Sequence, residues 1–140
     1  ISDQIKITPF LVPHRDEYSE TIGFNISGPN KSILFIPDID KWGIWQKDIV
    51  AEIEKNDHLF LDATFFDGTE LPGRDMSQIP HPSVIESMQL FKDLPVNEKQ
   101  KIHFIHFNHT NPLYQSGSNA RDVLKNAGFQ LAKQRQIINL

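Results

Sequence analysis

Residues 101–112 read KIHFIHFNHTNP, and this stretch carries both a fold signal and a candidate site. The apolar-rich alternation over Ile102–Phe107 is typical of a buried strand. The strand delivers His106 at its end, with Asn108 and His109 beside it before a proline. An imidazole at the end of a buried strand, facing a loop with a second imidazole, suits a metal site at the rim of a sheet.

Similar patterns predict further elements on both sides of this stretch. Alternating β-formers predict strands over residues 4–12, Thr21–Ser27, Ile33–Ile36 and His58–Thr64, and a final strand-like run over Phe129–Ile138. Periodic apolar residues predict helices over Asp40–Lys55 with Asp40 as the cap, from Ser83 to Leu94, and over Ala120–Ala127 before Gly128. An irregular loop over Phe65–Pro82 and a polar connector over Asp93–Lys101 complete the chain. Strands that alternate with helices indicate a layered α/β (α+β) domain.

The composition excludes several classes of protein. The chain has 140 residues, enough for one domain with a core, and its net charge of −4 gives no general attraction to nucleic acid or anionic membranes. No apolar run approaches the roughly 20 residues of a membrane helix, and no signal peptide is visible. Without cysteine, any metal must be held by histidine, carboxylate oxygen or water. The lack of cysteine fits cytoplasm or periplasm, with the cytoplasm slightly favoured.

Three polar residues follow predicted strands and are candidate metal ligands. His14 comes after the first strand, Asp38 after Ile33–Ile36, and His106 at the end of the strand first described. Neutral imidazole and carboxylate are the usual ligands of zinc and related metals when no sulfur is present. Each residue also has a plainer interpretation, as a hydrogen-bonded rim histidine or as an aspartate that caps a turn or helix. Their shared position at three strand ends favours the metal site.

Asp62 and His81 form a second candidate pair. Asp62 lies inside the apolar run LFLDATFF, where an unpaired carboxylate is costly and therefore needs a partner. His81 lies at the far end of the irregular loop, just before a helix. A buried carboxylate that orients an imidazole prepares a general acid or base. The alternative is that Asp62 caps a turn through backbone amides and His81 is an exposed loop residue.

Three further polar residues are candidates for substrate binding. Arg74 lies in the irregular loop, and Asn108 and His109 follow the strand that ends at His106. A guanidinium binds an anionic group through two parallel hydrogen bonds, so Arg74 suits an anionic part of a substrate. The alternative is that Arg74 and Asp75 simply hold their own loop in place.

Several segments in this order resemble the C-terminal half of metallo-β-lactamase-fold proteins, most closely the PqqB-like branch (coenzyme PQQ synthesis protein B-like). They are VPHRDEYSETIGF, FIPDID, LDATFF, GRDMSQIPHP and FIHFNHTNP. The resemblance implies an αβ/βα four-layer sandwich with one or two metal ions at one edge. It implies that His14, Asp38 and His106 are metal ligands, with Asp38 bridging. LDATFF is also similar to a segment of ribonuclease Z relatives in which a Glu pairs with a downstream His, which implies that Asp62 pairs with His81.

The chain departs from that family in one respect. The HxHxDH motif, which supplies most of the family's metal ligands and lies in its N-terminal half, does not occur in these 140 residues. We therefore expect residues 1–140 to form about the C-terminal half of a single domain. We expect the missing N-terminal half to be a partner, because this chain alone should expose one apolar face of its sheet. A homodimer is left open.

The resemblance implies a metal-dependent hydrolase. A metal-bound hydroxide would attack an ester, amide or phosphodiester of a small molecule, and His81, oriented by Asp62, would protonate the leaving group. Zinc is the expected metal, with manganese or iron as alternatives. Two other hypotheses stay open: an iron-dependent oxygenase that acts in quinone cofactor biosynthesis, and a non-catalytic binding protein on the same fold. Metal content discriminates among the three.

Overall fold

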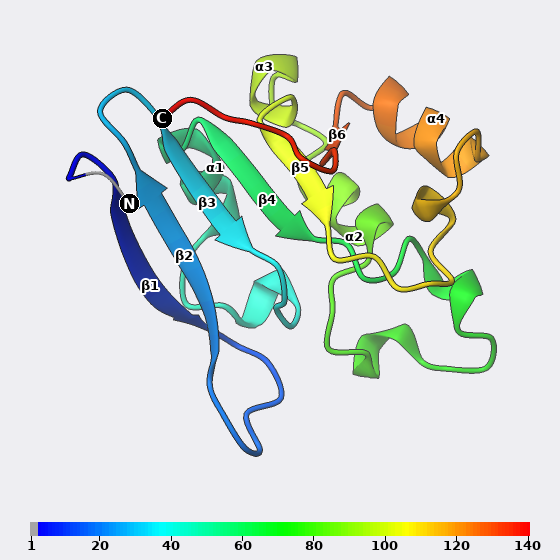
Figure 1. Ribbon diagram of the computed structural model, residues 1–140. Coiled ribbons are helices and arrows are strands. Elements are labelled where there is room, and N and C mark those ends of the chain that lie inside the picture. Colours follow the sequence, from blue (N-terminus) through cyan, green and yellow to red (C-terminus); the bar gives the residue numbers. More distant parts are fainter. Residues whose placement is uncertain (1–2) are drawn as a thin grey trace.

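The computed structural model describes residues 3–140, which form one sheet of six strands in the order β1-β2-β3-β4-β5-β6. Figure 1 shows this sheet with α1 and α2 on its far side. The first three strands pair in antiparallel fashion, and β3 to β6 run parallel. The strands are β1 (Lys6–Val12), β2 (Thr21–Ser27), β3 (Ser32–Ile36), β4 (His58–Asp62), β5 (Ile102–Ile105) and β6 (Gln130–Leu131).

This topology gathers several strand ends at one edge. Because β2 runs opposite to both of its neighbours, β1 points in the same direction as β3. The parallel strands β4 and β5 share that direction. The carboxyl ends of β1, β3, β4 and β5 therefore lie at the same edge of the sheet, where the predicted site residues follow them.

The helix predicted over Asp40–Lys55 is wrong in its first half. That segment contains a short 3₁₀ helix, η1 (Trp42–Ile44), and α1 begins only at Ile49 and ends at Lys55. Asp48, not Asp40, caps α1 by accepting a hydrogen bond from the backbone N–H of Val50 at 2.9 Å. A glycine lies in the first half and lowers its helix propensity, whereas Asp48 directly precedes the buried apolar residues of α1.

The remaining helices follow the predictions more closely. They are α2 (Val84–Leu90), α3 (Val96–Lys99) and α4 (Asn119–Asn126), with 3₁₀ helices η2 (Gly68–Glu70), η3 (Met76–Gln78) and η4 (Pro112–Tyr114). Ser83 and Glu86 form a capping box at the start of α2. Gly128, with φ of +94°, supplies the left-handed conformation that ends α4. Within residues 3–140, no helix combines the length and hydropathy needed to cross a membrane.

Two predicted segments differ from the structure. The polar connector over Asp93–Lys101 contains the short helix α3, and the final strand-like run over Phe129–Ile138 forms only the two residues of β6. Gln130 and Leu131 of β6 pair with His103 and Phe104 of β5.

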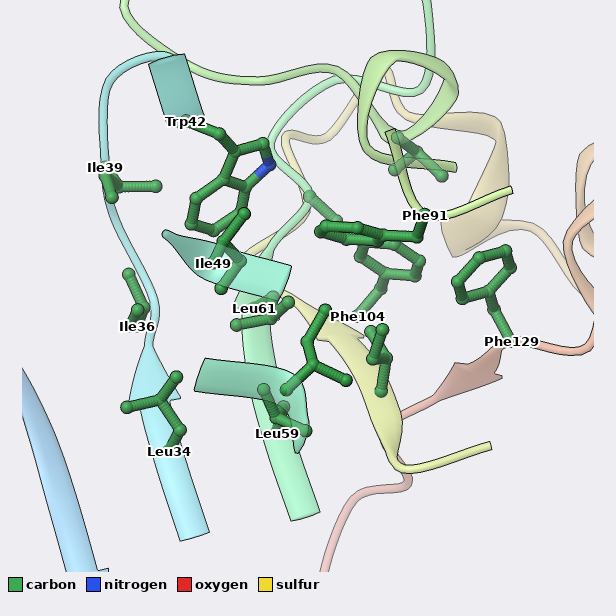
Figure 2. Close-up of a cluster of buried hydrophobic side chains, with 14 of the residues drawn as sticks. Leu34, Ile36, Ile39, Trp42, Ile49, Leu59, Leu61, Phe91, Phe104 and Phe129 are labelled. Carbon is green, nitrogen blue, oxygen red and sulfur yellow. The ribbon is translucent and has the colours of Figure 1, made fainter. Parts of the chain in front are cut away.

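The core lies between the sheet and the helices on its far side (Figure 2). Alternate residues of β3, β4 and β5 point into it, as period-two strands require. Trp42 from η1 and Phe91 after α2 cover them, with their ring centroids 6.3 Å apart. The strand residues of this core are Leu34, Ile36, Leu59, Leu61, Ile102 and Phe104.

Replacing Phe104 by alanine is expected to lower the free energy of unfolding by roughly 3–5 kcal/mol. Phe104 is fully buried, and its ring centroid lies 5.8 Å from that of Phe129, so the change leaves a cavity that the neighbours cannot fill. Urea unfolding measures the effect. The control is Val123→Ala, since Val123 is 38% exposed on α4 and its loss should stay within about 0.5 kcal/mol. Equal effects of the two changes would contradict the assigned core.

The opposite face of the sheet is apolar and carries no helix in the described part of the chain (Figure 1). A continuous row of paired residues crosses it, namely Pro9, Phe24, Phe35, Phe60 and His103. Near its outer edge, Ile7 is 43%, Leu11 61% and Ile22 40% exposed. The predicted apolar face is therefore present, and a surface of this kind typically contacts another protein surface.

His103 on this face makes folding stability depend on pH. Its imidazole stacks on Phe60 at 5.1 Å, and burial, with a smaller effect of the His58 charge, lowers the pKa of His103 below 6.5. Below about 6.5 the unfolded chain therefore binds more protons than the folded chain. The stability that the neutral, buried His103 allows is therefore fully present above pH 6.5. It is lost as the pH falls toward the pKa of His103 in the folded chain.

We therefore expect His103→Gln to flatten the fall in unfolding free energy between about pH 7 and pH 5.5. The measurement is urea unfolding across this range, with His109→Gln, an exposed histidine outside the sheet, as the control. An unchanged pH slope in His103→Gln would contradict the assignment.

Candidate metal centre

Five side chains meet at the carboxyl edge of the sheet: His14, Asp38, Asp62, His81 and His106. Four of them come from strand ends. His14 lies two residues beyond β1, Asp38 two residues beyond β3, Asp62 is the last residue of β4, and His106 directly follows β5. The loop over residues 65–82 brings the fifth, His81, back to the same place.

The loop that carries His81 is closed at its base. The backbone N–H of Val84 donates to the carbonyl of Phe65 at 2.9 Å, and that of Ile85 donates to Phe66 at 3.1 Å. These bonds hold the start of α2 against the segment that follows β4. His81, three residues before α2, is therefore placed beside Asp62 at the end of β4.

Asp38 lies between two imidazoles. Its Oδ1 is 3.3 Å from Nε2 of His14 and 3.4 Å from Nδ1 of His81. The backbone N–H of Asp40 donates to the carbonyl of Pro13 at 2.7 Å, which joins the segments after β1 and β3 across the start of β2. Oδ1 of Asp38 and Nδ1 of His14 are buried but have no hydrogen-bond partner among the described residues. An unpartnered buried carboxylate oxygen that faces nitrogen ligands fits a bound cation.

Asp62 is fully buried, and both of its oxygens are used. Oδ2 accepts from Nδ1 of His81 at 2.8 Å and from the backbone N–H of Ile39 at 3.2 Å. Oδ1 accepts from the backbone N–H and the hydroxyl of Thr64, at 2.8 and 2.7 Å. Asp62 therefore both orients His81 and caps a turn, so the two interpretations of this residue are compatible.

The pKa of Asp62 reflects two opposed influences. Burial raises it, but the His106 and His81 imidazoles and the Thr64 hydroxyl outweigh burial, so the pKa of Asp62 lies below its ordinary value. The carboxylate therefore stays ionised at neutral pH. As an acceptor only, it requires a proton on Nδ1 of His81 and leaves Nε2 as the other reactive ring atom.

His106 has a left-handed backbone, with φ of +64°, a conformation that costs a non-glycine residue about 1 kcal/mol or more and is concentrated at functional sites. Its Nδ1 lies 3.0 Å from the Thr64 hydroxyl and 3.6 Å from Oδ1 of Asp62. The interaction with the Asp62 carboxylate raises the pKa of His106 against the opposite effect of burial, with further help from the charge of Asp38. Because the Thr64 hydroxyl donates to Asp62, it accepts from Nδ1 of His106.

The five residues form two groups of three whose ligand atoms lie within 4.8 Å of one another. One contains His14, Asp38 and His81, and the other contains Asp38, Asp62 and His106. The predicted set of His14, Asp38 and His106 is divided between them, with Asp38 common to both. Such a nitrogen and oxygen donor set suits zinc, manganese or iron.

A cavity of about 240 Å³ adjoins this cluster. It is lined by His14, Arg15, Phe65, Leu71, Arg74, Ile79, Pro80 and His81. The predicted substrate residue Arg74 is therefore next to the cluster. Asn108 and His109 are not part of this lining; Oδ1 of Asn108 accepts from the backbone N–H of His109 at 2.9 Å and lies 2.9 Å from Nδ1 of the His109 ring. The substrate role of these three residues stays a prediction.

Two residues at the site were missed by the sequence reasoning. Thr64 links Asp62 to His106, and its signal was available, since Thr two residues after Asp is typical of a side-chain-capped turn. Arg15 lines the cavity, and its position next to His14 was the available signal. Asn111 in the loop after β5 is fully buried and donates to the carbonyls of Ala63 at 2.7 Å and Thr64 at 3.2 Å, which fixes that loop.

Comparisons with known proteins point to one family. The family model described as a beta-lactamase superfamily domain matches residues 1–107. Among curated proteins, the chain is 26% identical over 121 residues to coenzyme PQQ synthesis protein B of Ruegeria pomeroyi, covering 81% of this chain and 39% of that protein. It is 29% identical over 134 residues to the protein of the same name from Nitrosococcus oceani, covering 89% of this chain and 42% of that protein.

Solved structures show the same fold. The Zn²⁺-bound PqqB of Methylobacterium extorquens superposes with a TM-score of 0.75 at 21% identity, over 99% of this chain and 52% of that protein. The metallo-beta-lactamase fold protein YhfI of Bacillus subtilis superposes with a TM-score of 0.59 at 14% identity, over 94% of this chain and 47% of that protein. The chain thus spans about two fifths of the length of the curated relatives and about half of the solved ones.

Proposed function

Because the chain belongs to the beta-lactamase superfamily, whose domain model matches residues 1–107, we propose that it carries part of the centre of a metal-dependent hydrolase. The observation that carries the proposal is the buried oxygen of Asp38, which has no hydrogen-bond partner among residues 3–140 and lies between His14 and His81. The substrate class is a small molecule with an ester, amide or phosphodiester bond. The net charge of −4 argues against a nucleic acid.

His14, Asp38 and His106 are the proposed metal ligands. Asp38 is shared by both groups of potential ligands, so it would bridge if two ions are held. A divalent ion bound here would supply Lewis-acid stabilisation of a developing oxyanion and lower the pKa of a coordinated water. Zinc is the ion that we propose first, since the donor set suits it and the similar PqqB structure is Zn²⁺-bound.

His81 is the proposed proton donor to the leaving group. Its Nδ1 donates to Asp62 at 2.8 Å, which fixes the ring and leaves Nε2 for proton transfer. The ionised Asp62 holds the His81 ring in one orientation, as a buried carboxylate does in a catalytic triad. Arg74, Asn108 and His109 are the residues that we propose to contact substrate.

The exposed apolar face of the sheet suits a partner segment that would cover it. We propose that the chain is the C-terminal half of one domain and that an N-terminal half covers Ile7, Leu11 and Ile22 and supplies further ligands. The apolar row that crosses this face, and the partial coverage of the solved structures, support this arrangement. By strand alternation, Asp62 lies on the same side of β4 as Phe60, so a covering segment would also close over the centre.

Elemental analysis of the intact protein tests the metal centre. Near-stoichiometric zinc, manganese or iron is expected in the wild type and should be lost in His106→Ala. His58→Gln, a histidine at the opposite end of β4, is the control and should retain the metal. A reconstituted wild-type protein without metal would overturn the proposal and leave a binding role on the same fold. Hydrolysis is then assayed with chromogenic esters, amides and phosphodiesters.

A second candidate function follows from the names of the curated relatives. Both are coenzyme PQQ synthesis protein B, which favours a role in synthesis of that cofactor. In this alternative the same histidines and aspartates hold iron and the protein acts as an oxygenase. Bound iron together with consumption of dioxygen would favour it, whereas bound zinc with hydrolysis of the test substrates would exclude it.

A further inference from the structure

We propose that Arg15 and Arg74 bind the acidic group of the substrate, a carboxylate or a phosphate, in the cavity beside the metal centre. The assignment of this molecule as a substrate rests on the proposed function. The binding site itself rests on the cavity and its lining. Arg15 comes from the segment after β1 and Arg74 from the loop between β4 and α2, and both line the same space of about 240 Å³.

The lining has a distinct chemical character. Among the residues that the structure describes, the lining combines two arginines and two histidines with four apolar residues and includes no aspartate or glutamate. The ring of Phe65 meets His81 edge-on, with centroids 6.0 Å apart, and Leu71, Ile79 and Pro80 complete the apolar part. A molecule that matches this surface has an acidic group at one end and an apolar or aromatic body.

Neither guanidinium has a partner within the described residues. Other cations of this chain are used structurally: Arg121 donates to the carbonyl of Leu113 at 2.7 Å, and Lys41 pairs with Glu86 at 2.8 Å. By contrast, no ion pair or side-chain hydrogen bond joins Arg15 or Arg74 to residues 3–140. Two free guanidinium groups on one cavity are a ready site for a planar or tetrahedral anion.

The acid beside Arg74 does not neutralise it. Asp75 caps η3, with Oδ1 accepting from the backbone N–H of Ser77 at 2.9 Å and from its hydroxyl at 2.7 Å. Asp75 therefore holds the loop without Arg74. The interpretation in which Arg74 and Asp75 pair only to hold their own loop does not apply.

The cavity shares two residues with the metal centre. His14 and His81 line it, and their ring centroids are 5.1 Å apart. A molecule anchored on the arginines would place its other end against these imidazoles, next to Asp38. The volume of about 240 Å³ is below the usual range of drug-sized ligand pockets, which favours an acidic group with about one ring.

Direct binding to the intact protein tests the proposal, with benzoate, phenyl phosphate and the uncharged benzamide as probes. Titration calorimetry is run on metal-loaded and metal-stripped protein. We expect the two anions, but not benzamide, to bind with or without metal. Arg15→Gln and Arg74→Gln should each weaken binding about tenfold or more, and Arg74→Lys should restore part of it. Arg135→Gln, an exposed arginine outside the cavity, is the control and should change nothing.

Several outcomes would overturn the proposal. Anion binding that is unchanged in both arginine variants, or equal binding of benzamide, would do so. Anion binding that is lost when the metal is removed, and that is unchanged by the arginine substitutions, would mean that the anion binds to the metal instead. A protein that holds no metal but binds benzoate through Arg15 and Arg74 would uphold the anion site while the proposed hydrolase fails. The relative affinities of benzoate and phenyl phosphate identify which acid the site prefers.

Discussion

Asp38→Ala is expected to abolish metal binding and to lower hydrolytic kcat about a thousandfold or more. Asp38 belongs to both groups of potential ligands, so its removal affects either ion position, whereas His14 belongs to only one. Loss of the carboxylate also leaves His14 and His81 facing each other without the negative charge between them. Elemental analysis and steady-state kinetics on the most reactive chromogenic substrate measure the effect.

The matched control for this change is Asp40→Ala. Asp40 lies two residues further along the same segment, and among the described residues its Oδ1 accepts only from the backbone N–H of Lys41, at 2.6 Å. We expect Asp40→Ala to keep the metal and most of the activity. Metal content that survives in Asp38→Ala would refute the shared-ligand role, and equal losses in the two variants would indicate a general effect on the loop.

Asp62→Asn is expected to lower kcat by roughly 10²- to 10⁴-fold with a much smaller change in KM. The amide is almost isosteric, but one of its two positions becomes a donor. At present Nδ1 of His81 and the backbone N–H groups of Ile39 and Thr64 all donate to the carboxylate. In the variant, the NH₂ group of the asparagine would face one of these donors and could not accept a hydrogen bond from it. The His81 ring thus loses its fixed orientation, and a buried hydrogen-bond network is broken at a cost of a few kcal/mol in stability.

The chain provides a matched control for this second change. Asp67 stands in the same Asp-x-Thr pattern, with Oδ1 accepting from the backbone N–H and hydroxyl of Thr69 at 2.8 and 2.6 Å. Within the described part of the chain Asp67 has no histidine partner, so Asp67→Asn removes the turn cap alone. If Asp67→Asn lowered kcat as much as Asp62→Asn, the effect would come from the turn, and the orienting role of Asp62 would be wrong.

Much of the fold was predictable because its signals are local. The strands at Thr21–Ser27, His58–Asp62 and Ile102–Ile105 match predicted runs, since buried strands require apolar residues in a short period. The predicted fold class, a PqqB-like metallo-β-lactamase fold of about half the usual length, is confirmed by the family match and the superposed structures. The prediction of a helix over the first half of Asp40–Lys55 was wrong because η1 is organised by burial of Trp42 and Trp45 in the core.

The amino-acid sequence by itself determined which side chains stand at strand ends, because alternation and turn residues mark those ends. Only the tertiary structure decided which of them meet. His14 reaches Asp38 because the Pro13 carbonyl and the Asp40 N–H join two segments across β2, and His81 reaches Asp62 through a loop closed at its base. Such contacts depend on strand order and on the paths of loops. Local periodicity does not encode either, since both arise from pairing between residues far apart in the chain.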